Sequence, residues 1–211
     1  MGKSRKELEL RQRRKYVLEC AEKLFAEKGF AGVTVADIAK ATEFSVGSLY
    51  LFFESKEALI KELLLERMKQ INEIISTQAT AKIPAVEKLG NSVDKLVDMF
   101  IEHIDFFKLY IMEVKGSELC PPPQEFGMEV HKLVKANYDA LVSIFKQGID
   151  EGAFRDDTSP LYMALFLESA MHCLVGYMLL IGDELPIDKV REGMQAMFYH
   201  GILKKGKGGR K

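Results

Sequence analysis

Apolar side chains recur every three to four residues along nearly the whole chain, which is the period of amphipathic α-helices. Alternating patterns typical of strands are scarce. The sequence therefore predicts an all-α fold of about nine helices. Hydrophobic residues make up 47% and charged residues 29% of the chain, a balance typical of globular proteins with a buried core.

Two short helices are predicted close together in the first third of the chain. Thr34 followed by Asp37 predicts a capping box at the start of a helix over residues 35–41. Ser45 predicts the N-cap of a second helix from Val46 to about residue 52. Two short helices joined by a tight turn predict a helix-turn-helix.

Longer helices are predicted on both sides of this motif. The helix before it carries a buried face around Phe25 and ends at Gly29, and the helix after it is capped by Ser55 and fades before Pro84. A further apolar stripe from Leu89 to Phe107 predicts a helix that either bends or restarts near His103 and runs toward Val114. The remaining predicted segments are a loop over 116–124, a helix from 126 to about 152, and helices over 161–182 and 186–203.

The segment 161–182 is long and apolar enough to be considered as a membrane span. Acidic residues flank it on both sides, Asp156 and Asp157 before it and Asp183 and Glu184 after it, so no positive bias would orient it. We therefore favour a helix that is buried on all sides, against its own core and against a second subunit.

The segment from Arg14 to Leu59 resembles the DNA-binding domain of the TetR family. The matching residues are Ala21, Leu24, Phe25, Gly29, Phe30, Val33, Thr34, Val35, Ile38, Ala39, Ser45, Gly47, Leu49, Tyr50, Phe53, Ser55, Lys56 and Leu59. The resemblance implies a transcriptional repressor that binds a pseudo-palindromic operator as a homodimer. It also implies a C-terminal helical domain that senses a small molecule.

A recognition helix needs little bulk at its N-terminus to enter the major groove, and Gly47 and Ser48 meet this need. By resemblance, Tyr50 and Lys56 occupy positions that clamp the DNA backbone. The predicted DNA-binding residues are Thr34, Val35, Ser45, Val46, Gly47, Ser48, Tyr50, Leu51, Phe52 and Lys56.

The motif departs from the family pattern at three positions. Relatives often carry Gly where Glu43 stands, a polar or basic residue where Val46 stands, and His or Tyr where Phe52 stands. Val46 is suited to contact a thymine methyl group. The alternative is that Val46 and Phe52 are core residues.

Charge is uneven along the chain, although the net charge is only −1. Residues 1–15 carry seven basic and two acidic side chains, and residues 204–211 carry five basic and none acidic. The first cluster predicts a basic arm that adds phosphate contacts, against the alternative of a solvated terminus. On this hypothesis, removing residues 1–15 weakens operator binding. The second cluster, with three glycines, predicts a disordered tail.

Beyond Pro84 the resemblance implies a five-helix sensor whose last two helices form the dimer interface. Aromatic residues and 10 methionines indicate a lipophilic effector. The predicted ligand-binding residues are Phe100, Ile104, Phe107, Tyr138, Leu141, Phe145, Leu165, Glu168 and His172. For the apolar members the alternative is plain core packing. For Glu168 and His172 it is a structural hydrogen-bonded pair or a contact across the dimer.

No enzyme, metal or cofactor motif is present in the sequence. The Glu-x-x-His spacing of di-iron bundles is absent at all four histidines, and the three cysteines form no Cys-x-x-Cys pair. We therefore predict no catalytic residues, no metal, no cofactor and a reducing, cytoplasmic location without a membrane partner. The predicted domains are 1–54 for DNA binding, 55–203 for ligand binding and dimerisation, and 204–211 as the tail. The alternative function is a helical scaffold or membrane-associated adaptor.

Overall fold

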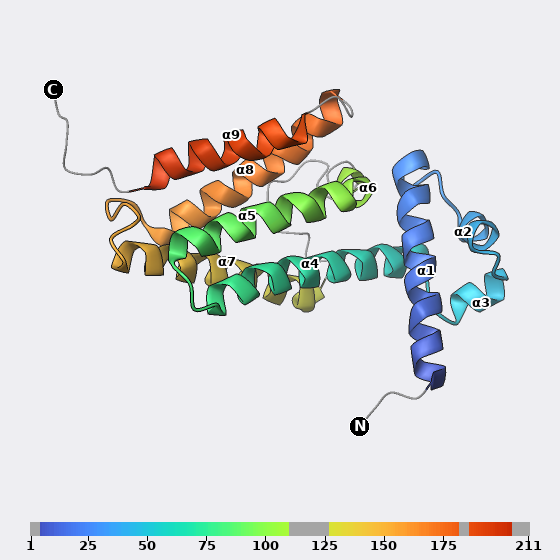
Figure 1. Cartoon of the computed structure of the whole chain (residues 1–211). Helices are drawn as coiled ribbons and strands as arrows, with labels where there is room; N and C mark the ends of the chain where they lie inside the picture. The colour runs from blue at the N-terminus through green and yellow to red at the C-terminus, as the bar shows by residue number, and fades with distance from the viewer. Residues whose placement is uncertain (1–4, 110–126, 182–185, 204–211) are drawn as a thin grey trace. The chain divides into compact units, whose positions relative to one another are not determined.

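A computed structural model describes residues 5–109, 127–181 and 186–203, and these ranges form nine helices (Figure 1). The all-α prediction is confirmed. The helices are α1 (Arg5–Lys28), α2 (Val35–Thr42), α3 (Val46–Tyr50), α4 (Lys56–Thr80), α5 (Ala85–Glu102), α6 (Ile104–Leu109), α7 (Gly127–Asp150), α8 (Pro160–Ile181) and α9 (Ile187–Ile202). The predicted 116–124 loop and the 204–211 tail lie outside the described residues.

The chain forms two compact units. The first unit comprises residues 1–67 and 104–127, and the second comprises residues 68–103 and 128–211. These units do not coincide with the predicted domains, because α4 contributes residues up to Arg67 to the first unit and α6 joins that unit from a distant part of the sequence. Figure 1 shows α1 between α6 and the pair α2 and α3, and α1 contacts both α2 and α6.

Local capping signals account for the short helices of the first unit. The Thr34 hydroxyl accepts a hydrogen bond from the Asp37 amide while the Asp37 carboxylate accepts one from the Thr34 amide, so the predicted capping box is present. Ser45 is the N-cap of α3, as predicted. Helix α3 ends at Tyr50, earlier than the predicted residue 52.

The turn between α2 and α3 contains a left-handed residue. Glu43 has φ 59°, and its amide donates back to α2 as the C-cap. This conformation favours glycine, because a Cβ crowds the backbone there. The geometry explains why glycine suits this position, the first of the three departures noted in the sequence.

The basic N-terminal segment is helical from Arg5 onward rather than an extended arm. It contains no glycine or proline within α1, and spaced ion pairs support it, with Arg5 on Glu9 and Lys15 on Glu19. The predicted basic arm is therefore part of a helix in these residues. The sequence pattern missed the extension because the segment has no apolar face.

The core of the second unit is built from α4, α5, α7, α8 and α9. Its buried side chains include Leu89, Val93, Leu141, Phe145 and Leu167, and α5 lies beside α9 (Figure 1). The N-terminus of α5 begins after Pro84, which offers no side-chain cap, so the Glu151 carboxylate from the end of α7 accepts a hydrogen bond from the Ala85 amide instead.

A close approach of two chain segments completes this core. A Cβ at Gly148 would lie 2.0 Å from a ring carbon of Phe154, whose side chain is fully buried. Gly152 has φ 70° and reverses the chain between them, where the sequence predicts the end of this helix. These two glycines therefore let the chain return and bury Phe154.

Of the two alternatives at His103, a bend or a restart, the structure shows the restart. His103 ends α5 with a non-helical backbone, and α6 begins at the next residue as part of the first unit. No helix in the described part of the chain is both long and apolar enough to cross a membrane.

Candidate nucleic-acid interface and ligand-binding interior

Helix α3 uses its own hydroxyl groups to hold its first turn. The Ser45 oxygen accepts from the Ser48 amide at 3.1 Å, and the two serine hydroxyls lie 2.8 Å apart. Both predicted DNA-binding serines are thus engaged with each other. Gly47 is exposed between them and leaves space for a close approach.

The outer face of α3 is apolar. Val46 is 41% exposed, Tyr50 53% and Leu51 85%, whereas Leu49 is buried in the first unit. One face of this helix therefore packs inward and the other presents large side chains to the outside. The alternative that Val46 is a core residue therefore does not hold, because its side chain is exposed.

Phe52 lies among other aromatic rings. Its centroid is 5.9 Å from that of Phe44, at an edge-on angle, and 6.5 Å from that of Phe53. Its backbone carbonyl accepts a hydrogen bond from Arg14 on α1. The half-buried position favours the core alternative for Phe52.

Lys56 holds the loop between α1 and α2. Its ammonium donates to the carbonyl of Phe30 at 2.7 Å and to that of Val33 at 2.9 Å, and it lies 4.1 Å from the centre of the Phe30 ring. Two of its three N–H donors are therefore used within the protein. The predicted phosphate contact would depend on the third.

Thr34 is exposed at the N-terminus of α2, and Val35 is half-buried beside it. The hydrogen bonds of the capping box, first from the Thr34 hydroxyl and then from its amide, lower the pKa of the Asp37 carboxyl. The ionised Asp37 carboxylate is favourable at this position, because it lies at the positive end of the α2 dipole.

Two ion pairs join α1 to α4, and neither could be inferred from the sequence pattern, because the partners lie more than 40 residues apart. Arg14 forms a two-pronged pair with Glu62 and lies 4.4 Å from the centre of the Phe53 ring. Arg67 pairs with Glu22 in the interior, where both side chains are at most 8% exposed. Burial raises the pKa of Glu22, and the nearby Arg67 partly offsets this.

The predicted ligand-binding residues fall into both units. Ile104 and Phe107 belong to the first unit, and Phe107 is buried there. Phe100, Tyr138, Leu141 and Phe145 pack together in the core of the second unit. The stripe that suggested one common lining is interrupted by the break at His103.

Leu165, Glu168 and His172 lie on α8. Leu165 is 39% exposed, and the other two side chains are about one-third exposed. His172 Nδ1 lies 3.0 Å from the backbone carbonyl of Glu168 and 4.0 Å from its carboxylate. Among the described residues, no three His, Cys, Asp or Glu side chains are grouped to hold a metal ion.

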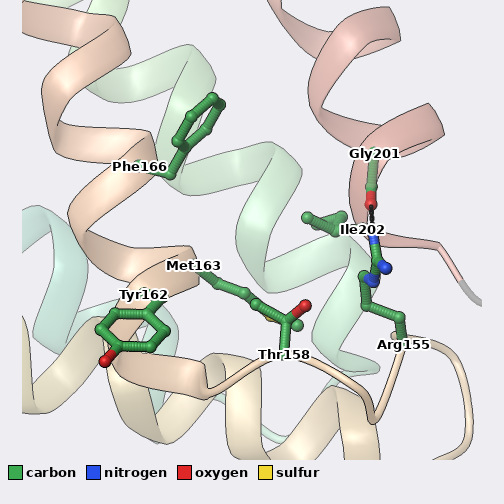
Figure 2. Close-up of a pocket in the computed structure, with 7 residues that line it drawn as sticks. All are labelled: Arg155, Thr158, Tyr162, Met163, Phe166, Gly201 and Ile202. Carbon is green, nitrogen blue, oxygen red and sulfur yellow. Dashed lines mark hydrogen bonds between the residues drawn. The ribbon is translucent and has the colours of Figure 1, made fainter.

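A cavity of about 330 Å³ opens beside the first turns of α8. Figure 2 shows Tyr162, Met163 and Phe166 from α8 at this cavity, with Arg155 hydrogen-bonded to the carbonyl of Gly201 at 3.2 Å. None of the predicted ligand-binding residues lines it. The sequence pattern missed this cavity because its lining comes from three separate segments, the third being the end of α9.

One face of α8 carries a row of exposed apolar side chains. Leu161, Tyr162, Leu165, Phe166 and Tyr177 are all exposed, and Phe166 reaches 73%. The 22 residues of α8 contain no lysine or arginine. This α8 face is suited to another apolar surface and not to a polyanion.

Comparison with known proteins supports the resemblance seen in the sequence. Residues 17–63, which contain α2 and α3, match the family described as "Bacterial regulatory proteins, tetR family". The HTH-type transcriptional repressor KstR2 of Mycobacterium tuberculosis is 28% identical over 204 residues, covering 94% of this chain and 96% of that protein. The HTH-type transcriptional repressor DhaR of Mycobacterium sp. is 28% identical over 177 residues, covering 83% and 87%.

Solved structures share the fold over nearly the full length. The ketosteroid transcriptional regulator KstR2 superposes with a TM-score of 0.72 at 25% identity, covering 92% of this chain and 96% of that chain. The transcriptional regulator FadR of Bacillus subtilis, in complex with stearoyl-CoA, superposes with a TM-score of 0.75 at 20% identity, covering 89% and 98%.

Proposed function

Because this chain belongs to the TetR family of transcriptional regulators, which are not enzymes, we propose that it is a repressor that binds a pseudo-palindromic operator as a homodimer and is released by a hydrophobic small molecule. The capped α2 and α3 with their exposed outer face carry the DNA-binding part of this proposal. Nothing in the described helices favours a scaffold or membrane-associated adaptor instead.

The α8 face supports the homodimer. A row of exposed apolar side chains on one helix costs solvation free energy unless a partner covers it. A second copy offers the same row, and an isologous contact buries both at once. In such a dimer the two recognition helices would lie about one DNA turn apart, roughly 34–36 Å.

The interior of the second unit supports the hydrophobic effector. Phe100, Tyr138 and Phe145 pack in its apolar core, and methionines such as Met163 and Met171 can repack around ligands of different shapes. One structurally similar protein, KstR2, is a ketosteroid transcriptional regulator, and another, FadR of Bacillus subtilis, was solved in complex with stearoyl-CoA. An effector that prefers the conformation unable to bind DNA would lower operator affinity by shifting the population.

Selection from random DNA tests both parts. The full chain should enrich one pseudo-palindromic sequence, and stearoyl-CoA, a ketosteroid and a panel of other hydrophobic compounds should then be screened for release of the labelled duplex. Enrichment of a palindrome and its release by one compound class would support the proposal. Failure to enrich any sequence would contradict operator binding, whereas enrichment without release by any hydrophobic compound would contradict the effector.

A further inference from the structure

The turn and recognition helix lack the side chains that normally read base edges by hydrogen bonds. Residues 42–55 contain no arginine, lysine, asparagine or glutamine. Guanine is usually read by Arg or Lys and adenine by Asn or Gln. Direct readout from this segment therefore needs another kind of contact.

The serine and threonine hydroxyl groups of the segment are largely occupied. Ser45 and Ser48 are engaged with each other, and the Thr42 hydroxyl donates to the Ile38 carbonyl from a buried position. Ser55 accepts from the amide of Ala58 at the start of α4. These groups stabilise the helix ends, so their capacity to bind bases is reduced.

The two carboxylates of the segment do not replace the missing hydrogen-bonding side chains as base-reading groups. Glu43 and Glu54 are both exposed and carry the same sign of charge as phosphate, which opposes close approach to DNA.

What α3 does present is apolar surface. Val46 and Tyr50 are four residues apart on one side of the helix, and Leu51, which follows at its C-cap, is the most exposed large apolar side chain of the described chain. In the major groove only thymine offers an apolar group, its 5-methyl. Branched aliphatic side chains are complementary to that group.

We infer that the first unit recognises its operator through the 5-methyl groups of thymine, contacted by Val46 and Leu51, and not mainly through hydrogen bonds to base edges. This inference rests on the proposed operator binding. It makes Val46 and Leu51 the specificity-determining residues, while the capped helix ends and Lys56 fix their position. Burial of one methyl group corresponds to about a fourfold change in affinity.

Deoxyuridine tests the inference, because it removes only the methyl group of thymine. Each thymine of the duplex selected from random DNA is replaced in turn, and affinity is measured by fluorescence anisotropy with the full chain. At least one thymine in each half-site should show about a fourfold loss. Val46→Ala and Leu51→Ala should each bind the thymine duplex more weakly and discriminate less between thymine and deoxyuridine at the positions that the shortened side chain contacts.

Two control variants keep the test specific. Val46→Thr retains a branched side chain with one methyl group and should keep part of the discrimination. Leu8→Ala removes an exposed leucine from α1 and should leave discrimination unchanged.

Tight binding that is indifferent to every deoxyuridine replacement would overturn the inference while leaving operator binding intact. Discrimination that persists unchanged in both alanine variants would also overturn it. Absence of any selected duplex would instead contradict the proposed function itself.

Discussion

The two units each leave apolar side chains exposed, but on surfaces of different character. In the first unit the exposed residues of α3 are few, and they share the unit with exposed basic residues of α1 such as Arg11 and Arg13. In the second unit the α8 face is longer and has no basic residue on its helix. The difference in charge agrees with the partners proposed for the two surfaces, DNA for the first and a second protein chain for the other.

The interiors differ as well. The first unit contains a buried ion pair between helices, Arg67 with Glu22, beside the ring of Phe106. In the second unit the buried Lys88 donates to a backbone carbonyl, that of Ala79, and the core around it is apolar. A charge pair requires one arrangement of α1, α4 and α6, whereas apolar packing tolerates substitution and repacking.

The largest effect is expected at the buried ion pair. Arg67→Met should lower the free energy of unfolding by about 3–5 kcal/mol, because it leaves the buried Glu22 carboxylate without its guanidinium partner. The double variant Glu22→Leu with Arg67→Met should recover most of this loss. Urea unfolding measures both, and equal instability of single and double variants would contradict the role of the pair.

The stability loss of the Arg67→Met variant should depend on pH. Burial already raises the pKa of Glu22 in the folded protein, and loss of Arg67 raises it further. When the pKa of a carboxyl is higher in the folded than in the unfolded protein, its contribution to the free energy of unfolding is most favourable below the unfolded pKa. That contribution is lost as pH rises through the pKa of the folded protein. Arg67→Met should therefore lose more stability at neutral pH than at pH about 4–5.

The next effect concerns the α8 face. Phe166→Asp should raise the dimer dissociation constant by at least about 30-fold, because a carboxylate would be buried at an apolar contact. Met128→Asp, which changes an equally exposed apolar residue on α7, is the matched control and should leave the mass in solution unchanged. Light scattering after gel filtration distinguishes the two, and a dimer retained in both would mean that α8 is not the interface.

A smaller effect is expected at the capping box. Thr34→Ala removes an N-cap oxygen and should cost about 1 kcal/mol of stability. The hydrogen bonds of Thr34 lower the pKa of Asp37, so the stability tied to that carboxylate is present above its ordinary pKa and is lost as pH falls through the folded value. The difference between wild type and variant should thus narrow in acid, as thermal unfolding at several pH values would show. A difference that is constant with pH would mean that Asp37 does not take part.

The smallest effect is expected at the turn before α3. Glu43→Gly relieves the left-handed backbone but makes the unfolded chain more flexible, so the net gain should be about 0.5–1 kcal/mol. Thermal unfolding measures it, with Glu54→Gly as a control that should not stabilise. A loss of stability on Glu43→Gly would show that the Glu43 side chain contributes more than its conformation costs.

The sequence predicted local features well and long-range ones less well. The capping residues Thr34, Ser45 and Gly152 make their contacts with residues close to them in the sequence. Their roles could therefore be inferred from spacing alone. Lys56 could not be understood in this way, because its carbonyl partners lie more than 20 residues earlier. The division of Phe100 and Phe107 between units was missed for the same reason. Periodicity shows which side of a helix is apolar but not which neighbour it meets.

The central claim is that the two exposed apolar surfaces serve different partners, and sedimentation equilibrium of two variants with the selected, labelled duplex tests it most directly. We predict that Leu51→Asp sediments as two chains that do not carry the duplex, and that Phe166→Asp sediments as one chain. If Leu51→Asp were instead monomeric, or if Phe166→Asp remained a dimer that binds the duplex normally, this account of the two surfaces would be contradicted.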